Sequence, residues 1–299
     1  MTANTAASVH QRLLNLARAE GRRFNDLLQH YALERWLYRL SQSTHRDRFI
    51  LKGALMLVAW ELPMARPTRD IDFLVRAENS LDIIAGMIAD ICVADAVDDG
   101  MMYDAASIKT SRIVEDAMYA GVRATFNGSL GRAKARMQVD AGFSDTVTPG
   151  PVEIVYPTAL EYPAPRLRAY NRETAIAEKF EAMVKLGDVN GRMKDFFDIW
   201  MLATNQGFEG SALAASITHT FERRGTKLEA DAACFREGFA SSEDKQIQWK
   251  AFIERAALGA IAPSSFAHVW RVVIDFLKRM AVGDPGALRW QPGGPWTAR

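Results

Sequence analysis

The stretch Thr68-Arg-Asp-Ile-Asp-Phe-Leu-Val75 decides the fold, because polar and apolar side chains alternate along it. Alternation with a period of two predicts a β-strand with one buried face. Since residues i and i+2 of a strand share a face, Asp70 and Asp72 project together, away from the core. Two such carboxylates repel unless a cation lies between them, and a hard divalent ion such as Mg²⁺ suits them. Taken alone, however, this short motif fits a solvated strand end better than a metal site.

A second strand that ends in a carboxylate is predicted at residues 135–140, where the alternation recurs. Arg136, Gln138 and Asp140 share one face of it. Residues 121–126 predict a further strand, and the glycines between the two segments indicate a hairpin.

A sheet could bring Asp140 beside Asp70 and Asp72. Three carboxylates on neighbouring strands are what two-metal phosphoryl or nucleotidyl transfer requires. One metal lowers the pKa of the attacking hydroxyl, and the other holds the triphosphate and its leaving group. A turn residue before Gly142 is an equally good interpretation of Asp140.

The stretch Phe49-Ile-Leu-Lys-Gly-Ala54 precedes the Asp-x-Asp motif and is followed by an apolar, helix-compatible segment. A glycine at a helix N-terminus lets phosphate oxygens approach backbone N–H groups. Lys52, Gly53 and Ala54 are therefore candidate phosphate-binding residues, although one glycine is weak evidence. Gly128-Ser129 imitates a Gly-Ser…Asp motif, and we interpret it as a hairpin turn.

The helix predicted at residues 172–186 carries Lys179 within or beside its apolar face. Lysine side chains are seldom buried without a partner. A phosphate group is one such partner, and extension of the amine to solvent is the alternative.

Four charged residues open the helix predicted at 193–205: Arg192, Lys194, Asp195 and Asp198. The two aspartates share a face at i,i+3 spacing. Interaction with the helix dipole and an i,i+4 pair between Lys194 and Asp198 are sufficient structural reasons for them. In the functional interpretation, the two basic residues bind a triphosphate or an RNA phosphate, and an aspartate orients Lys179.

Composition narrows the classes of protein. The chain of 299 residues holds 37 Lys and Arg against 36 Asp and Glu, a formal net charge of +1. This balance excludes a wholly basic nucleic-acid coat protein but allows a local basic groove. The two cysteines, Cys92 and Cys234, are far apart, so we expect a reducing compartment rather than a disulfide scaffold. With no predicted membrane span or signal core, we expect a cytoplasmic protein.

Further helices are predicted at 8–41, interrupted at Gly21, and at 80–91. After a proline-rich stretch at 149–165 the pattern is almost wholly helical, at 172–186, 193–205, 210–224, 245–259 and 265–281. We expect the irregular tail to dock through its two tryptophans, Trp290 and Trp296. The sequence predicts an α+β fold with three parts: an N-terminal helical segment (1–45), an α+β domain (46–165) and a helical domain with an irregular tail (166–299).

Taken in order, five segments resemble the AbiEii/AbiGii toxin family of nucleotidyltransferases, which includes the mycobacterial MenT-type toxins. They begin at Phe49-Ile-Leu-Lys-Gly-Ala, Arg66-Pro-Thr-Arg-Asp-Ile-Asp, Val139-Asp-Ala-Gly-Phe-Ser-Asp, Glu173-Thr-Ala-Ile-Ala-Glu-Lys and Arg192-Met-Lys-Asp-Phe-Phe-Asp. The resemblance covers nearly the whole chain, and the combination is much more specific than any one segment.

The resemblance implies a polymerase-β-like nucleotidyltransferase core with a mixed sheet, an added helical domain, Mg²⁺ and a nucleoside triphosphate. It implies a toxin of a type IV toxin–antitoxin or abortive-infection system, with an AbiEi-type antitoxin and a tRNA or other RNA 3′ end as acceptor. Asp70, Asp72 and Asp140 match the family's metal-binding positions. Lys179 matches its triphosphate-binding lysine, and Asp195 or Asp198 its late aspartate.

Ala54 departs from the family, because a Gly or Ser with a phosphate-binding role is usual there. Two other functions therefore stay open. One is a degenerate nucleotidyltransferase that binds a nucleotide or a protein without turnover. The other is transfer to a small molecule or a protein side chain. We expect Asp70 and Asp72 to hold the metals and Asp140 to complete the site, while Lys179, with Arg69 or Arg192, neutralises the triphosphate.

Overall fold

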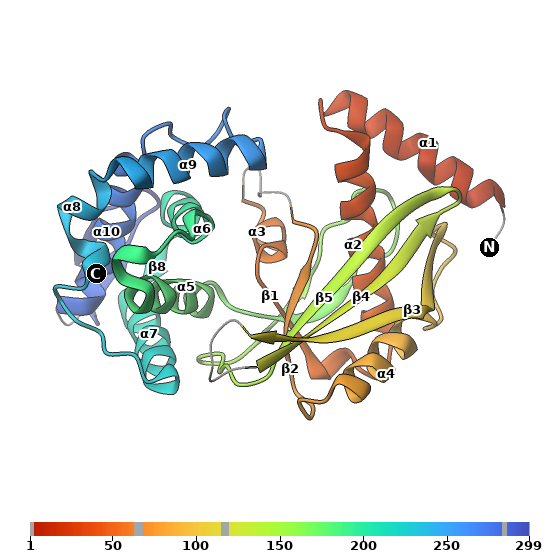
Figure 1. Ribbon diagram of the computed structural model, residues 1–299, viewed down its shortest axis with the longest axis horizontal. Helices are drawn as coiled ribbons and strands as arrows, with labels where there is room; N and C mark the ends of the chain where they lie inside the picture. The colour runs from red at the N-terminus through yellow and green to blue at the C-terminus, as the bar shows by residue number, and fades with distance from the viewer. Residues whose placement is uncertain (1–2, 63–67, 115–119, 283–285, 299) are drawn as a thin grey trace. The chain divides into compact units, whose positions relative to one another are not determined.

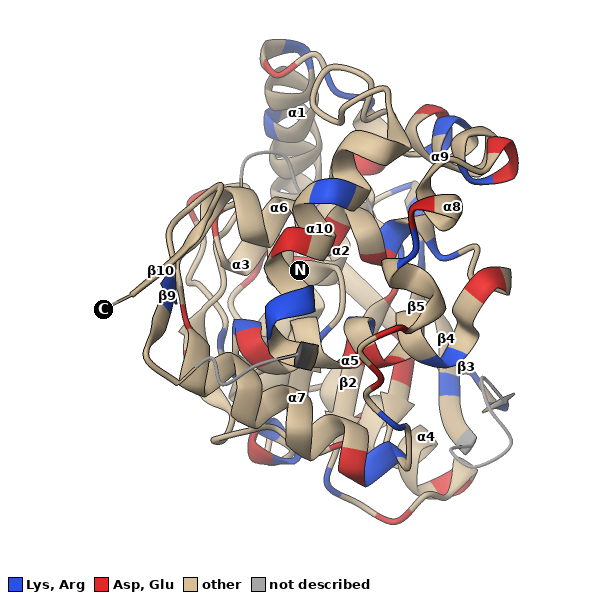
Figure 2. Cartoon of the chain, turned by 90° about the vertical axis from the view of Figure 1, so that its left-hand side faces the viewer, with Lys and Arg blue, Asp and Glu red and all other residues tan. Residues whose placement is uncertain are grey.

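The computed structural model describes residues 3–62, 68–114, 120–282 and 286–298 (Figure 1). The chain divides into two compact units. The first unit contains residues 1–61, 67–144 and 152–169, and the second contains 62–66, 145–151 and 170–299. The domain boundaries expected at residues 45 and 165 stay predictions. Basic and acidic residues are interspersed in the chain (Figure 2), and their formal charges nearly cancel.

The first unit is built on a seven-stranded mixed sheet in the order β3-β4-β5-β2-β1-β7-β6. Its strands are β1 (Phe49–Lys52), β2 (Ile71–Val75), β3 (Met101–Val114), β4 (Ala120–Leu130), β5 (Ala133–Gly142), β6 (Val152–Val155) and β7 (Arg166–Ala169). The pairs β2–β5 and β1–β7 are parallel, and the other pairs are antiparallel. The predicted α+β fold with a mixed sheet is confirmed.

Helices pack on one face of this sheet (Figure 1). They are α1 (Ala3–Ala19), α2 (Phe24–Gln42) and α4 (Leu81–Cys92), and the unit also contains α3 (Leu55–Ala59) and the 3₁₀ turn η1 (Arg46–Arg48). The predicted break at Gly21 is confirmed, since this glycine lies between α1 and α2 with φ of +63°. Trp36 of α2 is fully buried and packs against Phe73 and Phe126 of the sheet, with ring centroids 6.1 and 6.0 Å apart.

The β4–β5 hairpin is present, but its turn differs from the prediction. Gly128 and Ser129 lie within β4, paired with Ala135 and Lys134, so the turn interpretation of Gly128-Ser129 is wrong. The turn follows instead at Gly131, where φ is +57°, a conformation that glycine adopts without a steric cost. The turn interpretation of Asp140 is also wrong, because Asp140 is paired inside β5.

Four strands of this sheet went unpredicted: β1, β3, β6 and β7. β3 begins with a run of residues whose alternation is broken by a register shift between Asp104 and Lys109. β1, β6 and β7 are each four residues long; β6 lies within the proline-rich stretch and β7 follows directly after it. Short or interrupted strands carry too few alternating positions to be recognised from the sequence.

The second unit is mainly helical. Its helices are α5 (Arg172–Leu186), α6 (Met193–Asn205), α7 (Gly210–Arg224), α8 (Glu237–Ala240), α9 (Glu243–Ala256) and α10 (Phe266–Val282), with the 3₁₀ turns η2 (Gly187–Val189) and η3 (Ala233–Phe235). The five helices predicted in this half are confirmed. Buried aromatic rings join them, including Phe197 of α6, Trp249 of α9 and Phe266 of α10.

The tail docks on the second unit, as predicted. Trp290 is buried and donates its indole N–H to the carbonyl of Ala203 at 2.7 Å, while Trp296 stacks on Phe276 with centroids 5.7 Å apart. The tail is more regular than expected, because β8 (Phe208–Glu209), β9 (Leu288–Trp290) and β10 (Trp296–Ala298) form a small sheet. Within the described ranges, no helix has the length and apolar character needed to cross a membrane.

Candidate active site

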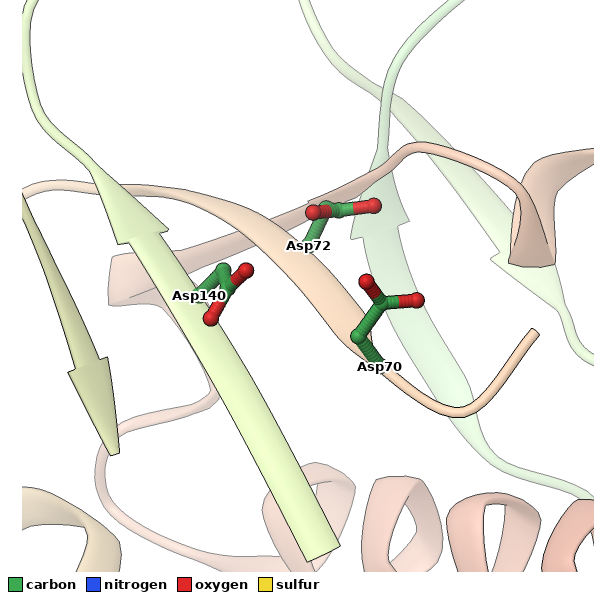
Figure 3. A group of neighbouring side chains, drawn as sticks. All are labelled: Asp70, Asp72 and Asp140. Carbon is green, nitrogen blue, oxygen red and sulfur yellow. The ribbon is translucent and has the colours of Figure 1, made fainter. Parts of the chain in front are cut away.

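Three carboxylates converge at the junction of β2 and β5 (Figure 3). Asp70 lies immediately before β2, Asp72 within it and Asp140 within β5. One carboxylate oxygen from each residue can be chosen so that all three lie within 4.8 Å of one another. Each residue is partly exposed. We call these three residues the acidic triad, and its assembly in space matches the sequence expectation for Asp70, Asp72 and Asp140.

Strand register explains how two residues distant in sequence meet. Asp72 is the direct partner of Asp140 in the parallel β2–β5 pair. On the other side of β2, Lys52 of β1 is the partner of Asp72, and on the other side of β5, Arg123 of β4 is the partner of Asp140. Directly paired residues share a face of the sheet. A row of four residues thus crosses four strands, and we call Arg123, Asp140, Asp72 and Lys52 the charged row.

The charged row places a basic residue outside each of two adjacent carboxylates. Neighbouring like charges destabilise a sheet, and adjacent opposite charges offset part of that cost. Arg123 forms a bidentate pair with Asp140, its Nε donating to Oδ1 at 2.8 Å and its Nη2 to Oδ2 at 2.7 Å. Gln138 donates a further hydrogen bond to Asp140 Oδ2 at 3.2 Å. The Asp140 carboxylate is therefore held in one orientation by a residue of its own strand, β5, and by a residue of the neighbouring strand, β4.

Gly53 makes room for the triad. Its φ is +75°, and a Cβ atom there would lie 2.0 Å from Asp72 Oδ2. Any other residue would push the carboxylate out of place, so the structure gives a reason for glycine that the phosphate-binding interpretation did not include. The adjoining Ala54 is buried, and α3 after it is five residues long.

Lys179 belongs to a second charged cluster, which lies within the second unit. Its Nζ donates to Asp195 Oδ1 at 3.1 Å and to Asp198 Oδ2 at 2.8 Å. Both aspartate side chains are 1% exposed, whereas the lysine side chain is 16% exposed. The expectation that an aspartate orients Lys179 agrees with this geometry, and two aspartates do so. Asp198 thus pairs with Lys179 of the preceding helix, rather than serving merely as an i,i+4 partner of Lys194.

The remaining basic candidates lie at the surface. Arg192 is exposed and its Nε lies 2.8 Å from Asp195 Oδ2. Lys194 and Arg69 are also exposed. Their solvated positions allow contact with a phosphate but do not by themselves indicate one.

A buried lysine supports the loop before α6, and sequence reasoning missed it. Lys245 of α9 donates to the carbonyls of Asp188 and Asn190 at 2.8 and 2.7 Å. Burial lowers the pKa of its amine. Asn190 Oδ1 in turn accepts the backbone N–H of Arg192 at 2.8 Å. Lys245 thereby anchors the chain at the start of the helix that carries Asp195.

Arg123 is the other residue that sequence reasoning missed. The signal was present, because Arg123 shares a face with the predicted strand's other outward side chains. Its partner, however, depends on the hairpin register, and the wrong turn assignment would have placed a different residue opposite Asp140.

The acidic triad fits a hard divalent cation. Mg²⁺ prefers oxygen ligands in an octahedron, and opposite ligands of one such ion lie about 4 Å apart. The separation of up to 4.8 Å is close to that value, so a small side-chain movement suffices for one ion. A carboxylate has about four lone-pair directions. The three hydrogen bonds of Asp140 therefore leave a direction for a metal.

Comparisons with known proteins identify the family of the chain. Residues 35–272 match the family described as nucleotidyl transferase AbiEii toxin, type IV toxin–antitoxin system. The solved structure of the nucleotidyltransferase toxin MenT4 from Mycobacterium tuberculosis is similar, with a TM-score of 0.50 and 15% identity over 90% of this chain and 96% of that one. JHP933 from Helicobacter pylori also has a TM-score of 0.50, with 14% identity over 85% of this chain and 92% of its own. At such identities the likeness shows a shared fold. Among curated protein sequences, none matches the chain.

Proposed function

The chain belongs to the AbiEii family of nucleotidyltransferase toxins from type IV toxin–antitoxin systems, and on that premise we propose the reaction that it catalyses. The proposed reaction is Mg²⁺-dependent transfer of a nucleoside monophosphate from a nucleoside triphosphate to an acceptor hydroxyl at an RNA 3′ end. The observation that carries this proposal is the charged row, which places two paired carboxylates, with Asp70 beside them, on one face of the sheet.

Asp70, Asp72 and Asp140 would hold the cation. When bound there, Mg²⁺ would polarise the α-phosphate and stabilise charge on both the attacking and the leaving oxygen. The acceptor oxygen forms a bond to the α-phosphorus, and the bond from that phosphorus to the bridging oxygen breaks. Pyrophosphate leaves, and a carboxylate oxygen of Asp140 accepts the hydroxyl proton.

Arg123 acts through Asp140 in this proposal and is a positioning residue. A guanidinium group matches a carboxylate in a planar, two-bond geometry that a lysine amine cannot reproduce. The fork of Arg123 keeps one oxygen of Asp140 aimed along the row toward Asp72. Gly53 helps to position the neighbouring carboxylate, because the absence of a side chain leaves space for Asp72.

Lys179, with Arg69 or Arg192, neutralises the triphosphate as negative charge builds on the departing pyrophosphate. Lys179 is suited to this task because Asp195 and Asp198 fix its amine while part of the side chain stays exposed. Lys194 and the backbone of Gly53 and Ala54 are further candidates for phosphate contacts, on the family resemblance.

The biological setting follows from the family. A type IV toxin implies an antitoxin partner, which we propose to be of the AbiEi type. We propose that this protein acts in the cytoplasm, because its proposed substrates, nucleoside triphosphates and RNA, are present there.

The test is incubation of the purified protein with total RNA, Mg²⁺ and each α-labelled nucleoside triphosphate in turn. We expect one nucleotide or more to label RNA, and Asp70→Ala to abolish both the labelling and any growth arrest on expression. Lys278→Gln on the exposed surface of α10 is a matched control and should keep full activity. Undiminished labelling by Asp70→Ala would overturn the assignment, whereas nucleotide binding without pyrophosphate release would favour the degenerate module.

A further inference from the structure

The strands β3, β4 and β5 have one buried face and one open face. The buried residues of β5 are Ala135, Met137, Val139 and Ala141. The register of β3, β4 and β5 places the alternate side chains in successive rows on the other face, which we call the open face. From the triad outward, the rows are Ser111–Arg123–Asp140, Lys109–Thr125–Gln138, Asp104–Asn127–Arg136 and Met102–Ser129–Lys134.

The open face offers basic side chains to solvent. Lys109, Arg136 and Lys134 are exposed, and the described part of the chain provides no ion-pair partner for them. Apart from Asp140, the acidic residue on these rows is Asp104, whose Oδ1 accepts the backbone N–H of Ala106 at 3.1 Å. Basic and acidic residues of these strands are coloured in Figure 2. Two of the cations, Arg136 and Lys134, lie on the same strand as Asp140 and share its face.

We propose that the open face binds the phosphodiester backbone of a single-stranded RNA acceptor, with its 3′ end directed toward the acidic triad. This inference rests on the proposed function, because it assumes that an RNA hydroxyl is the acceptor. Charge complementarity argues for this occupant: lysine and arginine side chains are the usual partners of backbone phosphates, and they bind without reading sequence.

The spacing along β5 suits such a strand. A strand residue advances about 3.4 Å, so Arg136 lies about 14 Å and Lys134 about 20 Å from Asp140. A stacked nucleic-acid strand advances about 3.4 Å per nucleotide, so these cations would meet phosphates about four and six nucleotides from the reacting end.

The chemistry of the rows favours RNA over a protein partner. A protein interface needs a desolvated apolar centre, usually with aromatic anchors. The three rows nearest the triad present polar side chains at every described position, and the first apolar one is Met102 in the fourth row. Hydroxyl and amide groups such as Thr125 and Asn127 can donate hydrogen bonds to phosphate oxygens between the cations.

The first experiment measures binding without chemistry. A 5′-fluorescein single-stranded RNA of about 12 nucleotides, which covers the expected footprint, is titrated with the full chain in the absence of nucleoside triphosphate and Mg²⁺. We compare wild type with the double variant Lys134→Gln/Arg136→Gln over a range of salt concentrations. Each phosphate contact on a single strand contributes about 0.7 to the slope of log K against log salt, so the double variant should lower that slope by about 1.4.

A matched control removes the same two charges elsewhere. Lys278→Gln/Arg279→Gln changes one lysine and one arginine that are exposed on α10, and it should keep the wild-type slope. Thermal unfolding of all three proteins establishes that each is folded. Equal slopes for wild type and the Lys134/Arg136 variant would overturn the proposal, as would failure of the wild-type protein to bind this RNA.

The second experiment uses acceptor length. We expect the ratio of kcat/KM for an acceptor of about 12 nucleotides to that for one of about three to fall about tenfold in the Lys134/Arg136 variant. The control variant should keep the ratio. A salt slope that responds to the variant without any RNA labelling would sink the proposed function and leave the open face as an RNA site. If the protein labels RNA but the variant leaves both the salt slope and the kcat/KM ratio unchanged, the proposed function stands and the open face is not the RNA site.

Discussion

Two charged clusters in the first unit consist of the same residue types, but one is a structural network and the other is the candidate site. The first, which we call the buried network, joins Arg35, Arg39 and Glu34 of α2 to Asp99. Asp99 is fully buried and accepts hydrogen bonds from both arginines at 2.8 to 3.0 Å and from the backbone N–H of Met101 at 3.0 Å. Both oxygens of that carboxylate have donors, and Arg39 also donates to the carbonyl of Met101, so the network ties α2 to the start of β3.

The acidic triad differs because its three carboxylates are partly exposed and lie within 4.8 Å of one another. The strand register gives them two neighbouring cations, Arg123 and Lys52. A carboxylate cluster with an excess of negative charge costs free energy that the buried network does not incur. The comparison teaches that the balance of charge within a cluster, rather than the presence of charge, separates a structural cluster from a candidate site.

The largest expected effect comes from Asp72→Asn. The amide keeps the shape that fits against Gly53 but removes a charged ligand. We expect nucleotide transfer to fall by about 10³-fold or more, equivalent to about 4 kcal/mol. The thermal midpoint without metal should hold or rise, because carboxylate repulsion decreases. Stabilisation by Mg²⁺, measured by calorimetry, should be lost; a variant that Mg²⁺ stabilises as much as wild type contradicts the assignment.

The corresponding change in the buried network is Asp99→Asn. It leaves Arg35 and Arg39 buried without their carboxylate, and breaking such a pair costs about 3 kcal/mol of unfolding free energy. Urea unfolding followed by circular dichroism measures this loss. Where the variant is still folded, transfer activity per folded molecule should match wild type, and a loss below about 1 kcal/mol would mean that the network is not structural.

The pH dependence of stability tests the same network through the titration of Glu34. Burial raises the pKa of the Glu34 carboxyl to about 7, from 4.5 in the unfolded chain. The folded protein therefore binds the proton more tightly, so the stability that Glu34 contributes is complete below pH 4.5 and is lost as pH rises to about 7. The loss amounts to at most about 3 kcal/mol. We expect Glu34→Gln to gain stability relative to wild type across that window, and a difference independent of pH would refute the shifted titration.

The smallest effect is expected for Arg123→Lys. Lysine keeps the charge beside Asp140 but cannot form the two-bond fork. We expect kcat to fall about tenfold, about 1.4 kcal/mol, with little change in the KM for nucleotide. The Mg²⁺ concentration for half-maximal activity should rise, and Arg123→Gln should be worse than Arg123→Lys. If the two substitutions have equal effects, Arg123 is not a positioning residue.

Much of the fold could be predicted because its signals are local. The alternation around Asp70 and Asp72 predicts one strand, and helical periodicity predicts α5, α6 and α7 to the residue. The errors fell where local signals conflict or are short. Gly128 is a residue type common in turns, but it lies within β4, because the turn of the hairpin is at Gly131 instead.

The sequence by itself determined the candidate residues: the Asp-x-Asp pair, a third aspartate on another strand and a lysine on a helix. Residue type and hydrophobic period can be recognised along the chain without knowledge of its tertiary contacts. Only the tertiary structure decided their arrangement. Strand order and register, which join positions far apart in sequence, placed Arg123 opposite Asp140 and Asp72 against Gly53. No local pattern specifies such pairings, because they result from packing the whole sheet against its helices.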